Sequence, residues 1–191
     1  MVVAWRLAFK LGVDMARIKA AENLETIREI QDELKIIKKR FGTIPNIYKI
    51  LAIRPQLFCH FSDARKTLME SSGVLEPRLR YMVAVLVSRI INCHYAYSWF
   101  SLGLRQQDVS YDVVSAISQD FRAAPIPEQE KAILAYADKL IRSPFSISDR
   151  EFERLRILGF SEEAVLETTM LVGFAETFSR MTLALGIELE C

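Results

Sequence analysis

Apolar residues recur along this chain three or four positions apart, and no stretch alternates apolar and polar residues for the length of a strand. The first clear repeat is followed by Gly42, and its apolar positions are Leu24, Ile27, Ile30, Leu34 and Ile37. This spacing gathers apolar side chains on one face of a helix, and glycine is common just after a helix ends. We therefore predict a helix over residues 23–40 and, because the same spacing continues, an all-α fold.

Proline, glycine and serine residues mark the ends of further expected helices. Pro77 suits the first turn of a helix, where its missing N–H has no partner to lose. Ser148 and Glu151 have the spacing of a capping box. The expected helices cover residues 47–53, 55–70, 75–91, 93–103, 110–118, 127–141, 148–159 and 161 onward. No linker, low-complexity tract or repeat separates them, which indicates one all-α domain.

The most informative stretch is the expected helix over residues 75–91 and the cysteine just after it. Apolar residues cover nearly its whole circumference, which indicates a helix buried on most sides; they are Met82, Val83, Val85, Leu86, Val87, Ile90 and Ile91. Asn92 is a good N-cap for a following helix that begins at Cys93. Unpaired N–H groups on a first turn favour a thiolate, so Cys93 is a candidate reactive cysteine. The alternative is a buried cysteine that packs as a small apolar residue.

Two histidines, His60 and His94, each follow a cysteine directly. Adjacent residues of a helix point about 100° apart, so neither Cys-His pair can hold a metal ion from one face. We therefore expect no metal site. The expected place of His94 is near a helix start, where it suits a surface or a subunit contact.

The composition excludes several classes of protein. The 191 residues carry a net charge of +1 with mixed signs, so the basic stripe of a nucleic-acid-binding protein is not expected. The hydrophobic content of 51% and the mean hydropathy of +0.14 favour a large core or an apolar surface buried between subunits. No run approaches the roughly 20 apolar residues of a membrane span. Three cysteines without framework spacing fit the reducing cytoplasm.

Several short motifs resemble the carboxymuconolactone decarboxylase superfamily, and within it the peroxidase-related branch of AhpD-like alkylhydroperoxidases. They are the run from Val87 to Tyr95 (VSRIINCHY), Gly103-Leu104, residues 123–132 (AAPIPEQEKA), residues 135–140 (AYADKL) and Gly159-Phe160-Ser161. The resemblance begins at about Met15, which implies a domain over residues 15–191 and an N-terminal extension over residues 1–14. It also implies an AhpD-like multi-helix bundle and a homo-oligomer, either a trimer or a hexamer.

The peroxidase members of this superfamily carry a Cys-x-x-Cys motif, a histidine four residues later and a glutamate on the preceding helix. In them the second cysteine attacks peroxide, the first resolves it, and the glutamate and histidine relay the proton. Matched to this chain, the first cysteine falls on Cys93, the second on Ala96, the histidine on Phe100 and the glutamate on Tyr81. The decarboxylase members place glutamate at the second-cysteine position and histidine at the position of Phe100, and this chain departs from that pattern too.

Three functions stay open on these residues. The first is a protein that has lost the usual peroxidase chemistry and keeps the fold for oligomer assembly and for binding a small apolar ligand or a partner. Its expected pocket residues are Tyr81, His94, Ala96, Tyr97 and Phe100. The second is a thiol-dependent hydroperoxidase that uses Cys93 on a peroxide substrate. The third is a decarboxylase-like enzyme with relocated carboxylates such as Glu76 or Glu176. None of the three calls for a cofactor.

Overall fold

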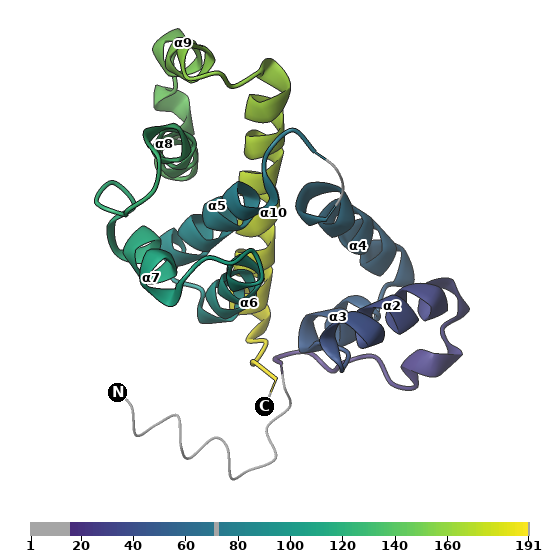
Figure 1. Cartoon of the computed structure of the whole chain (residues 1–191). Helices are drawn as coiled ribbons and strands as arrows, with labels where there is room; N and C mark the ends of the chain where they lie inside the picture. Colours follow the sequence, from purple (N-terminus) through teal and green to yellow (C-terminus); the bar gives the residue numbers. More distant parts are fainter. Residues whose placement is uncertain (1–15, 71–72, 191) are drawn as a thin grey trace. The chain divides into compact units, whose positions relative to one another are not determined.

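The computed structural model describes residues 16–70 and 73–190, and every regular element in these ranges is helical (Figure 1). This confirms the all-α prediction, while the expected extension over residues 1–14 lies outside the described residues. The α-helices are α2 (Gln31–Phe41), α3 (Asn46–Leu51), α4 (Pro55–Met69), α5 (Pro77–Ile90), α6 (His94–Arg105), α7 (Tyr111–Asp120), α8 (Glu128–Arg142), α9 (Asp149–Ile157) and α10 (Glu162–Leu185). The described residues group into two compact units, residues 16–62 with 182–190 and residues 63–181 without 71–72.

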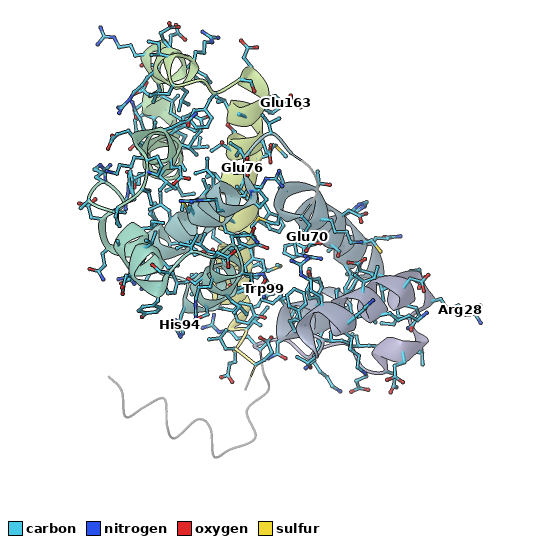
Figure 2. All side chains as sticks on the ribbon, viewed as in Figure 1. Arg28, Glu70, Glu76, His94, Trp99 and Glu163 are labelled. Atoms are coloured by element: carbon cyan, nitrogen blue, oxygen red, sulfur yellow. The ribbon has the colours of Figure 1, made fainter. Side chains whose placement is uncertain are left out.

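In the unit that holds the N-terminal helices, the prediction of one helix over residues 23–40 is wrong in its first part. That part forms two 3-10 turns, η1 (Leu24–Thr26) and η2 (Arg28–Ile30), and the α-helix begins at Gln31. The break has a local cause, because Asn23 is left-handed (φ 50°) and Ile27 is extended (ψ 95°). Arg28, at the start of η2, points away from the unit (Figure 2). Gly42 ends α2 as predicted, with a φ of 76° and its N–H on the Lys38 carbonyl.

This first unit has its own apolar core and is closed by the last residues of the chain. Ile37, Ile47 and Phe58 are fully buried, and the Tyr48 and Phe58 rings lie 5.4 Å apart. Asn46 Nδ2 donates to the Glu188 carbonyl at 2.9 Å. The C-terminal residues therefore belong to the same unit as α3.

The second unit is built around α5. All residues from Leu79 to Ser88 are buried, which confirms the prediction of a helix covered on most sides. Helices α6, α7 and α8 pack against it, and Pro77 occupies its first turn as predicted (Figure 1). Helix α6 thereby rests on a helix that is buried along most of its length.

The sequence predicts that helix α6 ends near Gly103, whereas the helix continues to Arg105. Gly103 is buried inside the helix, and a Cβ atom built there would overlap the Tyr81 ring. The glycine therefore serves the close approach of α5 and α6 rather than the end of a helix.

Helix α9 begins with the predicted capping box, in which Ser148 and Glu151 satisfy each other's backbone. Glu151 also accepts from Lys139 Nζ of α8. The hydrogen bond from Lys139, with those from the Ser148 side chain and backbone, lowers the pKa of Glu151 to about 2. One carboxylate thus caps α9 and ties it to α8.

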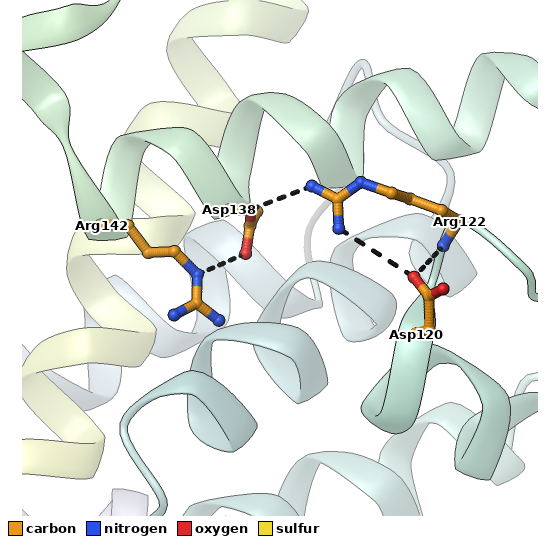
Figure 3. Close-up of polar contacts among 4 residues, drawn as sticks. All are labelled: Asp120, Arg122, Asp138 and Arg142. Atoms are coloured by element: carbon orange, nitrogen blue, oxygen red, sulfur yellow. Dashed lines mark hydrogen bonds and ion pairs between the residues drawn. The ribbon is translucent and has the colours of Figure 1, made fainter.

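A surface network joins the end of α7 to α8 (Figure 3). Asp138 binds two arginines, with Oδ2 3.3 Å from Arg122 Nη2 and Oδ1 2.8 Å from Arg142 Nε. Arg122 also donates its backbone N–H to Asp120 Oδ1 at 3.0 Å. The arginines are largely exposed, so each pair contributes about 1 kcal/mol or less.

None of the helices in residues 16–70 and 73–190 combines the length and the apolar character that crossing a membrane requires.

Candidate functional site

The junction of α5 and α6 places Cys93 at the start of α6. Asn92 is left-handed (φ 60°), its N–H donates to the Arg89 carbonyl, and the Cys93 N–H donates to the Ser88 carbonyl at 2.9 Å. These two bonds form a Schellman motif, which ends α5. The prediction that Asn92 is the N-cap of the next helix is therefore wrong by one residue, because Asn92 belongs to the end of α5.

Cys93 is itself the N-cap of α6. Its backbone is extended, and its Sγ accepts a hydrogen bond from the Ala96 N–H at 3.4 Å. The residue is only 2% exposed. The site thus combines a helix-capping thiol with close burial.

The buried side of α6 continues from Cys93 into an aromatic cluster. Ala96 and Phe100 lie one and two turns further along and are 0% and 1% exposed, whereas Tyr97 is half-buried. The Phe178 ring of α10 lies 5.2 Å from Phe100 and also contacts the rings of Tyr95, Trp99 and Phe174. Trp99 is labelled on α6 in Figure 2. The positions matched to the second cysteine and to the histidine are therefore packed as core.

The two other predicted pocket residues lie in different surroundings. Tyr81 on α5 is 7% exposed, and its ring covers Gly103. His94 is the first residue of α6 and is exposed (labelled in Figure 2). The fold thus puts Tyr81, Cys93, Ala96 and Phe100 among buried residues, and it leaves His94 at the surface.

A buried ion pair next to Tyr81 did not figure among the predicted site residues. Arg80 Nε lies 2.8 Å from Glu167 Oε1 of α10, and the two side chains are 1% and 11% exposed. Glu167 Oε2 accepts from the Val74 and Leu75 N–H groups at 2.8 and 3.2 Å. The only sequence signal was an arginine inside a helix with an apolar circumference.

A pocket of about 430 Å³ lies between α8, α9 and α10, and none of the predicted site residues lines it. It is mostly apolar and is lined by Tyr136, Phe152, Arg156, Phe160, Glu162, Val165, Leu166 and Thr169. In sequence these residues read as ordinary amphipathic helix positions, so no motif marks them.

The carboxylates considered for decarboxylase-like chemistry are engaged or exposed. Glu76 is exposed at the N-cap position of α5, and Glu176 Oε1 accepts from Arg180 Nε of its own helix at 2.8 Å (Figure 2). Within residues 16–70 and 73–190, no group of three or more histidine, cysteine, aspartate or glutamate side chains is placed to hold a metal ion.

No protein-family model matches the sequence, and no curated protein matches it either. Solved structures do match. A peroxidase-related protein with an alkylhydroperoxidase AhpD core from Ralstonia eutropha JMP134 is 24% identical, with a TM-score of 0.87 over 94% of each chain. A peroxidase-related protein from Silicibacter sp. TM1040 is 24% identical, with a TM-score of 0.83 over 95% of this chain and 91% of that one.

A third match is the debrominase Bmp8, as a cysteine-to-alanine variant in complex with 2,3,4-tribromopyrrole. It is 21% identical, with a TM-score of 0.76 over 90% of each chain. Proteins of this fold therefore differ in activity. At such identities the likeness establishes the architecture, and it agrees with the resemblance found in the sequence: this chain has the AhpD-like all-α fold.

Proposed function

We propose that this protein has lost the two-cysteine peroxidase chemistry and uses the AhpD-like fold, as a homo-oligomer, to bind a small apolar ligand or a partner. The observation that carries the proposal is the packing of Ala96 and Phe100. A methyl group at the attacking position cannot cleave peroxide, and a phenyl ring at the relay position cannot carry a proton. Both side chains are almost fully buried in the contacts of α6.

The burial of Cys93 supports the same proposal. Reaction of a cysteine with peroxide requires an accessible thiolate. At 2% exposure, the Cys93 thiol is closed to a peroxide unless α6 moves. Cys93 then acts as a structural cap, because its sulfur accepts the Ala96 N–H that the helix start would otherwise leave unpaired.

A ligand-binding role agrees with what proteins of this architecture hold. Bmp8 was crystallised with 2,3,4-tribromopyrrole, a small halogenated ring. The AhpD-like fold therefore accommodates compact aromatic molecules in at least one protein.

Large apolar side chains at the surface support the homo-oligomer, expected as a trimer or hexamer. Phe145, Ile157 and Met170 are 91%, 76% and 57% exposed, and burial of apolar surface between subunits is one way to cover such side chains. Light scattering coupled to size exclusion is expected to give three or six times the chain mass of 21.9 kDa; a monomer at micromolar concentration would contradict the assembly.

The deciding experiment for the chemistry measures consumption of hydrogen peroxide and of an alkyl hydroperoxide with excess dithiol. We compare the wild type with Cys93→Ser, and use Cys59→Ser as the matched control because Cys59 is partly exposed. We expect all three proteins to be equally inert while circular dichroism shows them folded. Turnover by the wild type and Cys59→Ser but not by Cys93→Ser would overturn the proposal.

A second candidate is a one-cysteine hydroperoxidase, favoured by the position of Cys93 at a helix start with an N–H on its sulfur. In that reaction the thiolate attacks one peroxide oxygen, the O–O bond breaks, and the other oxygen leaves as alcohol or water after protonation. The sulfenic acid is then reduced by two equivalents of an external thiol, with release of water and formation of a disulfide between them. The same assay separates the two candidates.

A further inference from the structure

The pocket between α8, α9 and α10 is distinct in its residues from the Cys93 site. Its walls come from Tyr136 of α8, Phe152 of α9, Phe160 just before α10, and Val165 and Leu166 of α10. Its volume of about 430 Å³ lies within the range of small-molecule sites, which is roughly 300–1,000 Å³. The lining residues all belong to the second compact unit, so the pocket is complete within it.

The aromatic walls suit a flat ring. The Tyr136 and Phe152 rings meet edge to face, with centroids 6.0 Å apart and planes at 64°. Phe152 and Phe160 remain only partly buried, so ring surface faces the hollow. An aromatic guest gains from offset or edge-to-face contact with such rings.

The polar group of the pocket has a defined hydrogen-bond polarity. Thr169 Oγ1 has a single proton and donates it to the Val165 carbonyl at 2.8 Å. The contact of 2.7 Å between Tyr136 Oη and Thr169 Oγ1 must then be a bond that Tyr136 donates. The Tyr136 oxygen consequently keeps only acceptor lone pairs. It can receive an N–H or O–H from a ligand, and it cannot donate to one.

The charged groups at the pocket cancel each other. Arg156 Nη2 lies 3.1 Å from Glu162 Oε1 and its Nη1 lies 3.6 Å from Glu153 Oε2. The Arg156 and Glu162 side chains are 54% and 86% exposed, so these charges are paired in solvent at the rim of the pocket. The other lining residues carry no charge, which favours a neutral ligand.

We propose that this pocket binds a neutral aromatic molecule of one or two rings that carries an N–H or O–H donor, as indole and phenols do. The rings lie against Phe152 and Phe160, and the donor is received by the Tyr136 oxygen. This inference does not depend on the chemistry at Cys93, because none of the lining residues belongs to α6.

The test uses the full chain and two probes, indole and 1-methylindole, with binding measured by ligand-observed NMR titration. The two molecules differ by the N–H donor and one methyl group. We expect indole to bind about two- to tenfold more tightly, the factor that one net hydrogen bond supplies. Tyr136→Phe should remove this preference and leave the affinity for 1-methylindole unchanged. Tyr111→Phe, a change at an exposed tyrosine of α7, is the matched control and should retain it.

Phe160→Ala provides an independent variant that removes one wall. We expect it to weaken both probes by a similar factor and to keep their ratio. The proposal is overturned if indole does not bind at any protein concentration, if the two probes bind equally to the wild type, or if Phe160→Ala leaves both affinities unchanged.

Discussion

Replacing Glu167 by glutamine tests how much the buried ion pair with Arg80 contributes to folding. The substitution conserves the shape of the side chain, and its amide oxygen can still accept from the Val74 and Leu75 N–H groups. It removes the negative charge 2.8 Å from the Arg80 guanidinium, which is 1% exposed. Removing one partner of a buried pair typically costs about 3–5 kcal/mol, because the remaining charge stays desolvated. We expect about 3 kcal/mol, the lower end, since Glu167 retains some exposure.

Urea unfolding followed by circular dichroism at 222 nm measures the effect. With a slope of about 2 kcal/mol per molar urea, a loss of 3 kcal/mol lowers the transition midpoint by about 1.5 M. Glu163→Gln is the matched control, because Glu163 lies one turn earlier on α10 and is exposed (Figure 2). That change should stay within about 0.5 kcal/mol of the wild type.

A double change to apolar residues, Arg80→Met with Glu167→Leu, separates charge from packing. Replacing a whole buried pair by apolar residues of similar volume is often neutral or stabilising. The double variant should therefore be more stable than Glu167→Gln alone. The reasoning is refuted if Glu167→Gln and Glu163→Gln give the same midpoint.

Three further outcomes are expected. Gly103→Ala should destabilise the protein by about 1–3 kcal/mol in the same urea assay, because the new methyl meets the Tyr81 ring. The double variant with Tyr81→Ala should lose less stability than the sum of the two single losses, and a neutral Gly103→Ala would contradict the close approach. Glu151→Gln should lower the stability of the protein at pH 6 and match the wild type near pH 2. The pKa of Glu151 is about 2 in the folded state and 4.5 ordinarily, so its carboxylate contributes stability that is present above pH 4.5 and is lost as the pH falls towards 2. Ala96→Cys places a second thiol at the residue whose N–H contacts the Cys93 sulfur. Refolding this variant under mild oxidation, when both thiols are accessible, should remove two titratable thiols per chain counted in denaturant, and an unchanged count would show the geometry to be wrong.

The helices of the second unit were predictable because their signals are local. Pro77, the Ser148–Glu151 capping box and the apolar repeat each act within a few residues, and the structure shows helix starts and faces where they indicate. The exceptions also have local causes. Asn23 and Ile27 adopt conformations that interrupt the first predicted helix, and this depends on backbone angles rather than on apolar spacing.

The candidate site was predictable only in part. Cys93 and the buried positions at Ala96 and Phe100 follow from helical spacing and from the resemblance. The role of Gly103 does not, because this glycine lies inside α6 against a tyrosine from another helix, and glycine more often follows the end of a helix. The pocket around Tyr136 is formed by residues from three helices, and its acceptor-only oxygen depends on which carbonyl Thr169 contacts. Such features arise from tertiary packing.

The close contact between Tyr81 and Gly103 has an evolutionary consequence. Position 81 matches the carboxylate of the peroxidase relay, and here its aromatic ring fills the space that the missing side chain of position 103 leaves open. A single change of Tyr81 to glutamate would place an acid there but leave a void over the glycine, at a cost in stability. Conversely, a larger residue at position 103 would clash while the tyrosine remains. The two positions are therefore expected to covary among homologous chains.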